Sequence, residues 1–219
     1  MEIRTRSGNI YSYNKQTGEI LGGSISAQLP KWNFAPFVPF ESMPQVDSFI
    51  LGLTEQCNLR CTYCCYSGNY VNKRSHNTVS MGTDDVDDIL LFIDSFTSNR
   101  PIKIFLYGGE PLLNYNIVQY AIEESRKQWD NDVSFTISTN GTTLTKERID
   151  WMVANNVVLA LSIDGTKPFH DSYRVDALGN GSYTEVYDAL KYIKTTYPEY
   201  AKEMSLIMTL ASFDKIIEI

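Results

Sequence analysis

The chain has 219 residues, of which 43% are hydrophobic and 21% are charged. This composition is typical of a globular protein, and the length is sufficient to bury one large core, so we expect one main domain. The formal net charge of -7 disfavours nucleic acids and membranes as partners, because anionic surfaces are bound by clustered Lys and Arg side chains. Residues 1–6 lack an apolar signal core, and no stretch approaches about 18 consecutive apolar residues. We therefore expect a cytoplasmic protein, in which thiols stay reduced.

The first part of the chain, residues 1–45, is expected to form a small N-terminal unit. Residues 8–21 predict a β-hairpin, because β-forming residues flank a turn-rich centre at 14–18. Residues 29–45 predict an irregular strap, because prolines forbid a regular helix or a central strand. These prolines, Pro30, Pro36, Pro39 and Pro44, lie among aromatic residues. The aromatic side chains are expected to cover exposed edges of the core, with a docking surface for a peptide as the alternative.

The rest of the chain is organised around residues 49–66, in which a short apolar run leads into three cysteines. Cys57, Cys61 and Cys64 follow a predicted strand with the spacing C-x3-C-x2-C. Three thiolates on one short loop can hold three corners of an iron-sulfur cube and leave the fourth iron without a protein ligand. The spacing therefore predicts a site at which a small molecule binds to an open iron.

Two other uses of the cysteines remain open. Structural zinc takes four ligands, and Cys65 or His76 could join the three cysteines. Adjacent Cys64 and Cys65 would, however, chelate one metal awkwardly. A disulfide framework is disfavoured, because four cysteines in 219 residues are few for a stapled secreted scaffold. We expect Cys65 to be a small buried side chain rather than a ligand.

Beyond the cysteines, helices and strands are predicted to alternate. Thr83 is an N-cap candidate followed by acidic residues, Ser182 begins a capping-box pattern, and Ser212 is expected to cap a further helix. Predicted helices cover residues 83–98, 114–129, 145–155 and 182–197, and predicted strands cover 102–107, 133–137, 157–161 and 204–210. With the strand before the cysteines, this gives five β units. We therefore expect an α/β fold over residues 46–219, with a parallel sheet, right-handed crossovers and the form of a partial (β/α) barrel.

Polar or glycine-rich motifs follow the predicted strands, and the carboxyl ends of barrel strands are where chemistry gathers. Gly108 and Gly109 would let the backbone come close to a ligand, or would form a tight turn before Pro111. Ser138, Thr139 and Asn140 offer hydroxyl and amide groups suited to a ribose diol or a carboxylate, with a cap and turn as the alternative. We expect these motifs to converge on one rim of the barrel.

The cysteine spacing, with Tyr63 just before the last cysteine, resembles that of the radical S-adenosylmethionine (SAM) enzymes. In that family the fourth iron chelates the amino and carboxylate groups of the methionine part of SAM. The segment from Gly108 through Glu110 to Pro111 matches letter for letter a Gly-Gly-Glu-Pro segment that, in this family, hydrogen-bonds the methionine ammonium of SAM. Residues 139–141 are similar to a Thr-Asn-Gly segment that lies beside the SAM ribose in related members.

A further motif follows the predicted strand at 157–161. Ser162 and Asp164 repeat the polar arrangement, although Asp164 with Gly165 also fits a plain turn. Residues 164–174 resemble the Asp-Gly-Pro...His-Asp...Arg segment of the SPASM-type subgroup, which matures peptides and sulfatases. This resemblance implies that Arg174 binds a carboxylate.

Several features depart from the subgroup. Two extra residues separate Gly165 from Pro168, and no cysteine follows Cys65, whereas the subgroup carries a Cys-rich C-terminal extension with auxiliary clusters. A full core of the family has six β units, and about five are counted in this chain. We expect His170 to be structural, because it has no metal partner at ligand spacing.

The resemblance implies a radical SAM enzyme, in which a reduced 4Fe-4S cluster cleaves SAM and the resulting 5'-deoxyadenosyl radical removes a hydrogen atom from a substrate. It also implies a peptide or protein substrate and an electron donor such as flavodoxin or ferredoxin. No catalytic side chain is expected, because the cofactor carries the radical. The implied metal ligands are Cys57, Cys61 and Cys64, and the implied cofactor-binding residues are Tyr63, Gly108, Gly109, Glu110, Pro111, Ser138, Asn140, Ser162, Asp164 and Arg174. The alternatives are a truncated homologue that binds cluster, SAM and peptide without catalysis, and a zinc-stabilised α/β protein.

Overall fold

The computed structural model describes residues 2–4, 10–13, 20–22, 46–66, 75–96 and 101–211. The chain divides into two compact units, Met1–Ser42 and Met43–Ile219, and each is described by itself. The predicted strap at residues 29–45 and the helix expected after Ser212 lie outside the described residues. The expected division of the chain at residue 45 stays a prediction.

The first unit contains a three-stranded antiparallel sheet in the order β1-β2-β3. Its strands are β1 (Glu2–Arg4), β2 (Ile10–Tyr13) and β3 (Ile20–Gly22). The pairing of β2 with β3, in which Tyr13 lies opposite Ile20, forms the hairpin that the sequence predicts. The sequence did not reveal β1, because three residues are too few to show a periodic pattern.

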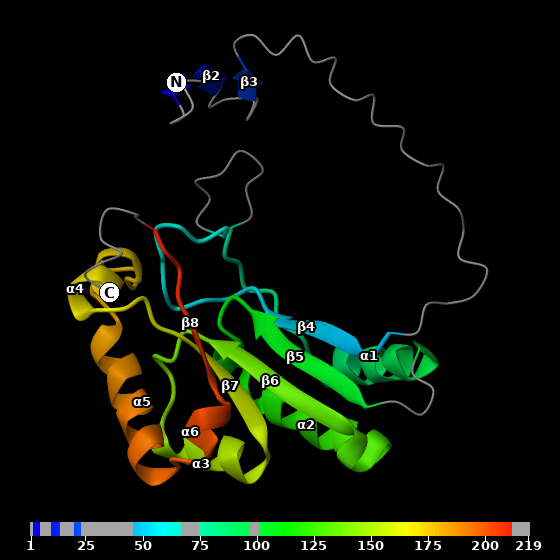
Figure 1. Ribbon diagram of the computed structural model, residues 1–219. Coiled ribbons are helices and arrows are strands. Elements are labelled where there is room, and N and C mark those ends of the chain that lie inside the picture. Colours follow the sequence, from blue (N-terminus) through cyan, green and yellow to red (C-terminus); the bar gives the residue numbers. More distant parts are fainter. Residues whose placement is uncertain are drawn as a thin grey trace. The chain divides into compact units, whose positions relative to one another are not determined.

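The second unit is built on a five-stranded sheet in the order β4-β5-β6-β7-β8, with every neighbouring pair parallel (Figure 1). The strands are β4 (Ser48–Thr54), β5 (Ile102–Gly108), β6 (Val133–Thr139), β7 (Val157–Ser162) and β8 (Ser205–Ile207). The order in space equals the order in the chain, so each crossover moves the chain one strand along. Within the described residues the sheet is open, with β4 and β8 at its edges. This arrangement confirms the predicted partial barrel.

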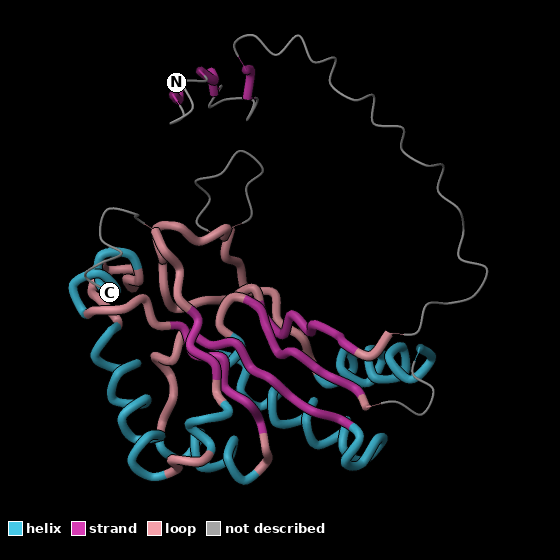
Figure 2. The backbone as a smooth tube through the Cα atoms, in the orientation of Figure 1, coloured by secondary structure: helices cyan, strands magenta, loops and turns pink. Residues whose placement is uncertain are grey.

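Helices cover one face of this sheet (Figures 1 and 2). They are α1 (Thr83–Phe96), α2 (Tyr115–Trp129), α3 (Lys146–Ala154) and α5 (Tyr183–Thr196). Burial alternates along β5, because successive side chains of a strand point to opposite faces. Ile104 and Leu106 are buried in the core, whereas Phe105 and Tyr107 point to the opposite face and are exposed. The apolar core therefore lies between the sheet and the helices.

The described part of the second unit also contains four short helical segments that the sequence did not predict. They are η1 (Pro111–Asn114), η2 (Asp130–Asp132), α4 (Lys167–Tyr173) and α6 (Tyr200–Glu203). The segment of α4 is predicted from the sequence only as a polar motif. It forms a helix in which Pro168 occupies the first turn, where the missing N–H of proline costs no hydrogen bond.

The two predicted helix caps that lie within the described residues, at Thr83 and Ser182, are not observed as predicted. A cap that the sequence did not predict lies at the start of α3, where the side chain of Thr145 accepts a hydrogen bond from the backbone N–H of Arg148 (3.3 Å). Thr83 is the first residue of α1, not the residue before it. The predicted capping box at Ser182 is wrong, because the hydroxyl of Ser182 donates to the carbonyl of Arg174 (2.9 Å) and makes no cap hydrogen bond.

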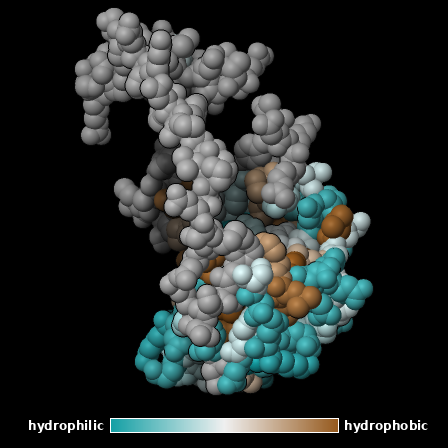
Figure 3. Space-filling view, turned by 90° about the vertical axis from the view of Figure 1, so that its right-hand side faces the viewer, coloured by the Kyte–Doolittle hydropathy of each residue, from teal (hydrophilic) through white to brown (hydrophobic). Residues whose placement is uncertain are grey.

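The surface of the second unit on the side of α1 is mainly hydrophilic and is interrupted by apolar groups (Figure 3). Leu91 and Phe92 on α1 and Ile50 on β4 are exposed. Single exposed apolar side chains are common on protein surfaces and indicate no particular partner. In the described part of the chain, no helix has the length and apolar character needed to cross a membrane.

The edge strand β8 presents an apolar surface. Leu206 is 56% exposed, and Ile207 and Met208 are exposed beside it. Because the backbone groups of an edge strand can pair with another chain, we predict that the 219-residue chain self-associates through β8. Leu206→Lys is expected to shift the chain toward monomers, because a charge on the edge opposes pairing. Light scattering measures both forms.

Leu178→Lys provides the control for this prediction, because Leu178 is 88% exposed and belongs to a turn, not to the edge strand. That substitution should leave the assembly state unchanged. A purely monomeric parent chain, or equal effects of the two substitutions, would contradict the prediction.

Candidate functional site

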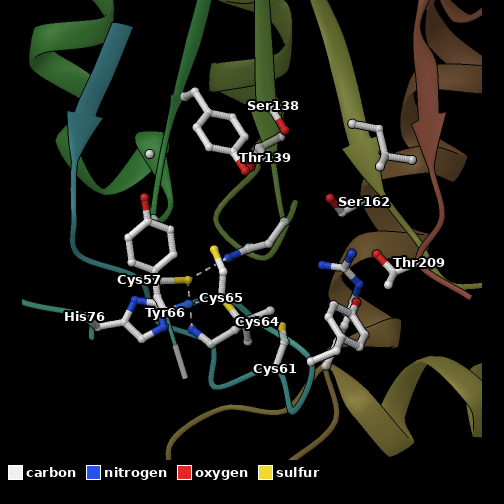
Figure 4. A pocket seen from close by; sticks show the side chains of 18 residues that line it. Cys57, Cys61, Cys64, Cys65, Tyr66, His76, Ser138, Thr139, Ser162 and Thr209 are labelled. Carbon is white, nitrogen blue, oxygen red and sulfur yellow. Dashed lines mark hydrogen bonds between the residues drawn. The ribbon is translucent and has the colours of Figure 1, made fainter. Parts of the chain in front are cut away.

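A cavity of about 400 Å³ lies at the carboxyl ends of the strands (Figure 4). Its lining includes most of the residues that the sequence predicts for the site. These are Cys57, Cys61, Cys64, Tyr63, Gly108, Gly109, Ser138, Asn140, Ser162 and Arg174. The predicted convergence of the strand-end motifs on one rim is therefore observed.

Three predicted residues are placed differently. Glu110, Pro111 and Asp164 are buried beneath the cavity and do not line it. The lining also contains residues that the sequence did not assign to cofactor binding. These are Leu59, Cys65, Tyr66, His76, Tyr107, Ile207 and Thr209. Thr139, which the sequence named beside Ser138 and Asn140, also lines the cavity. Tyr107 could have been found because it lies at the end of its strand, whereas Thr209 was not found because no polar motif was predicted for residues 204–210.

The prediction that Cys65 is buried is wrong. Cys65 is exposed and lines the cavity. The loop turns tightly before it, with the N–H of Cys64 donating to the carbonyl of Cys61 (3.1 Å), and this turn brings Cys65 to the surface. His76 also lines the cavity and stacks on Tyr66, with 5.6 Å between the ring centroids.

Hydrogen bonds hold the cysteine loop in place, both at cysteine sulfur atoms and along its backbone. The N–H of Leu59 donates to Cys57 Sγ (3.4 Å), and the N–H of Tyr66 donates to Cys64 Sγ (3.4 Å). The backbone is also tied to the segment that follows α4, because Arg60 N–H donates to the carbonyl of Val175 (2.6 Å). Thr62 N–H donates to the carbonyl of Tyr173 (3.0 Å) in the same way. The loop is therefore held by tertiary contacts.

The thiols are free and partly buried, and burial sets their acidity. Burial raises the pKa of Cys61 to about 11. The pKa values of Cys57 and Cys64 are also raised, mainly by burial and further by nearby negative groups. Iron that binds these thiols must displace their protons, so we expect loading of the site to be favoured at higher pH.

The three thiols suit the ligation of an iron-sulfur cube. They come from one loop, they are free, and they line one cavity. In a cube each thiolate binds a different iron, and three thiolates leave the fourth iron open.

Gly108 and Gly109 pack tightly against the loop that follows β4. Gly108 has a φ of 144°, and a Cβ there would lie 2.3 Å from the carbonyl oxygen of Thr54. A Cβ on Gly109 would lie 2.2 Å from the carbonyl oxygen of Gln56. Both contacts are too short for any side chain, so glycine is required for packing while the two backbones line the cavity.

Glu110 lies under the cavity with a 0% exposed side chain. Its carboxylate accepts hydrogen bonds from Leu112 N–H (3.0 Å), Thr139 Oγ1 (2.7 Å) and Asn140 N–H (2.7 Å). Burial raises the pKa of Glu110, and these hydrogen bonds oppose that effect. The side chain therefore joins the end of β5 to the end of β6, and ligand contact from this segment is left to the backbone of the two glycines.

Asp164 forms a second buried anchor, with a 0% exposed side chain. It accepts hydrogen bonds from Arg174 Nε (2.8 Å), Thr209 N–H (2.9 Å) and the hydroxyl of Tyr63. Burial and the adjacent carboxylate raise the pKa of Tyr63, so its hydroxyl remains a donor. Asp164 thus fixes Arg174 in the cavity wall, where the guanidinium can meet an anionic group.

His170 is buried in a hydrogen-bond chain behind this pair. Its Nδ1 accepts from the N–H of Asp164 (3.1 Å), and its Nε2 lies 3.1 Å from Ser182 Oγ. Burial lowers the pKa of His170 and so favours the neutral ring. Because Nδ1 accepts a hydrogen bond, the single proton of that ring lies on Nε2. This placement supports the structural role expected from the sequence.

The match to known families identifies the class of this protein. The model of the Radical SAM superfamily matches residues 51–211. The chain therefore belongs to the radical SAM superfamily, an enzyme family whose cofactors are a 4Fe-4S cluster and SAM. The resemblance seen in the cysteine and Gly-Gly-Glu-Pro motifs is confirmed.

Similar proteins include sulfatase-maturating enzymes. The chain is 28% identical over 161 residues to a cysteine-type anaerobic sulfatase-maturating enzyme of Clostridium novyi (strain NT), covering 72% of this chain and 43% of the relative. It is 31% identical over 143 residues to a serine-type enzyme of Bacteroides thetaiotaomicron, covering 63% and 34%. A GTP 3',8-cyclase of Haemophilus influenzae is 33% identical over 124 residues, covering 55% and 34%. The chain thus spans less than half the length of these relatives.

Solved structures agree on the fold. Native anSMEcpe with bound AdoMet has a TM-score of 0.61 at 23% identity, covering 74% of this chain and 43% of that chain. BtrN in complex with AdoMet and 2-DOIA has a TM-score of 0.53 at 18% identity, covering 78% and 60%. At these identities the likeness shows the fold alone.

In a ligand-clash interpretation, a side chain at Gly109 would occupy the space that SAM needs and would weaken SAM binding without unfolding the protein. The glycine packing predicts a loss of stability instead. We predict that Gly109→Ala lowers the melting temperature of the protein, because its Cβ would press on the carbonyl of Gln56. Gly52→Ala is the matched control, since a Cβ at Gly52 meets nothing within 4 Å. Melting curves and calorimetric titration with SAM separate the two effects. An unchanged melting temperature with lost SAM affinity would restore the ligand-clash interpretation.

The buried carboxylate generates a second prediction. We predict that Glu110→Gln lowers the free energy of unfolding by about 1–3 kcal/mol, because an amide cannot accept from all three donors and leaves one of them unpaired in the interior. Glu123→Gln on the exposed side of α2 is the control and should change little. Denaturant unfolding measures both variants, and equal stabilities would refute the anchoring role of Glu110.

Proposed function

We propose that this chain is the SAM-cleaving core of a radical SAM enzyme that modifies a peptide or protein side chain. One observation carries the proposal: three thiols from a single loop share one cavity with Gly108, Gly109 and Arg174, and the buried Asp164 holds Arg174 behind the cavity wall. A thiol triad and a fixed cation on the same cavity suit a ligand that is both metal-binding and anionic at one end. The methionine part of SAM has that chemistry.

In this proposal Cys57, Cys61 and Cys64 each hold one iron and leave the fourth iron for SAM. When bound, the cluster supplies the electron that cleaves SAM reductively to the 5'-deoxyadenosyl radical, which takes a hydrogen atom from the substrate. The protein contributes binding and orientation, and we assign no catalytic side chain. The backbone N–H groups at Leu59 and Tyr66 keep the outer sulfurs of the triad in place.

The other cavity residues would orient SAM. Arg174 is held by Asp164 at 2.8 Å and would bind the methionine carboxylate. The backbones of Gly108 and Gly109 line the cavity and would meet the methionine ammonium there. The hydroxyls of Ser138 and Ser162 line the same cavity and would reach the ribose or the carboxylate.

A peptide or protein substrate is supported by the relatives. Two of them are sulfatase-maturating enzymes, and one solved neighbour at a TM-score of 0.60 contains anSMEcpe with both AdoMet and a Cp18Cys peptide. The similarity to GTP 3',8-cyclases shows that related cores also serve other substrates, so the core fold alone does not select the peptide. We further propose an electron donor such as flavodoxin or ferredoxin, a cytoplasmic location, and no nucleic-acid partner.

Iron counting tests the cofactor assignment. In anaerobically reconstituted protein we predict that Cys57→Ala, Cys61→Ala and Cys64→Ala each lose most of the bound iron and the production of 5'-deoxyadenosine with dithionite as reductant. Cys65→Ala is the matched control, because Cys65 lies on the same loop and is exposed at the cavity. It should keep its iron.

The outcomes distinguish the remaining alternatives. A cluster that survives Cys61→Ala but not Cys65→Ala would refute the ligand set. A full cluster with SAM binding but without 5'-deoxyadenosine would indicate the non-catalytic binding homologue. Stoichiometric zinc in place of iron would indicate the zinc-stabilised protein.

A further inference from the structure

Asn140, just after β6, uses both ends of its side-chain amide within the protein. Its Oδ1 accepts hydrogen bonds from the N–H (3.0 Å) and the hydroxyl (2.7 Å) of Thr142. Its Nδ2 lies 3.0 Å from Asn58 Oδ1 and 3.8 Å from Cys57 Sγ. Turning the amide round would set its NH2 group against the N–H of Thr142, so these contacts establish that the donor end faces the sulfur.

A closed ring of hydrogen bonds holds this orientation. Asn140 donates to Asn58 Oδ1, Asn58 Nδ2 donates to Thr142 Oγ1 (2.7 Å), and the Thr142 hydroxyl donates back to Asn140 Oδ1. In such a ring each group is a donor to the next, and the members polarise one another. Neither amide can rotate without breaking two of these bonds.

The backbone of Asn140 is fixed as firmly as its side chain. The buried carboxylate of Glu110 accepts the N–H of Asn140 (2.7 Å) and the hydroxyl of Thr139 (2.7 Å). Asn140 itself is only 8% exposed. The amide is therefore presented to Cys57 by tertiary contacts within the protein.

Cys57 is the sulfur that faces the Asn140 amide, with 3.8 Å between Nδ2 and Sγ. The N–H of Leu59 donates to the same sulfur at 3.4 Å. Hydrogen bonds to cluster sulfurs favour the reduced cluster, because they stabilise its additional negative charge, and they are one of the means by which proteins set cluster potentials.

We infer that Asn140 is a positioning residue that donates an N–H···S hydrogen bond to the cluster through Cys57 and raises the reduction potential of the cluster. The inference rests on the proposed function, in which Cys57 is an iron ligand. The ring of hydrogen bonds among Asn58, Thr142 and Asn140 would keep the Asn140 amide donor directed at the Cys57 sulfur. The cluster then accepts an electron more readily from a cellular donor.

Pulsed EPR of the reduced cluster tests the contact directly. In protein labelled with 15N only at asparagine, we expect a 15N hyperfine coupling that disappears in Asn140→Leu and Asn140→Asp. Leu is close in shape and neutral, so it removes the donor without adding charge. Asn155→Asp is the matched control, because the Asn155 amide donates to the carbonyl of Trp151 (2.9 Å) at the end of α3, and this variant should keep the coupling.

Redox titration without SAM gives the second readout. Asn140→Leu is expected to lower the equilibrium constant for one-electron reduction about tenfold, which is a shift of about 59 mV to more negative potential. Thr142→Val opens the ring but retains Asn140, and it should shift the potential in the same direction by a smaller amount. Asn155→Asp should leave the potential unchanged.

The results separate this inference from the proposed function. If the unsubstituted chain assembles no cluster, both fail. If it assembles a cluster and cleaves SAM but shows no asparagine 15N coupling, or if Asn140→Leu keeps full iron and the original potential, only this inference is overturned. Should Asn140→Leu lose its iron, the coupling in the unsubstituted chain and the potential of Thr142→Val decide the question.

Discussion

The buried carboxylate of Glu110 needs donors on every side, and the arrangement of the cavity depends on how they are supplied. Desolvating a carboxylate is costly unless hydrogen bonds replace its water. Here the donors come from Leu112, Thr139 and Asn140, which lie at or just beyond the carboxyl ends of two neighbouring strands. Satisfying one side chain therefore fixes two of the loops that form the site. Through the Asn140 amide the same constraint reaches the cysteine loop.

Asp164 plays the corresponding part on the other side of the cavity. Its oxygens bring together Tyr63 from the cysteine loop, Arg174 from the end of α4 and the backbone beyond β8. The two carboxylates differ in one respect: Glu110 is surrounded by neutral donors, whereas Asp164 is paired with a guanidinium. Negative charge is thus buried behind the cavity, while the positive group of Arg174 remains on its wall. An incoming anion meets that positive group first.

The sequence predicted the strands and long helices well, because burial on one face of each element leaves a periodic pattern. It also placed the cysteines and Gly-Gly-Glu-Pro correctly at strand ends. It failed where tertiary contacts compete with local rules. The Ser182 hydroxyl matches a capping pattern but is taken by the carbonyl of Arg174, and no local signal separates the lining backbone of Gly109 from the buried side chain of Glu110. Which way a side chain points at a strand end is decided by partners distant in the sequence.

The backbone hydrogen bonds that hold the cysteine loop have a consequence for the order of events during folding. Arg60 and Thr62 bond to Val175 and Tyr173, which the ribosome adds only after β5, β6 and β7 have been made. Contacts of such long separation form late, because the entropy of closing the intervening chain must first be offset by the structure between them. The three thiols therefore reach their final arrangement near the end of folding. Iron delivered earlier would meet a flexible loop, so insertion of the cluster belongs after the sheet has formed.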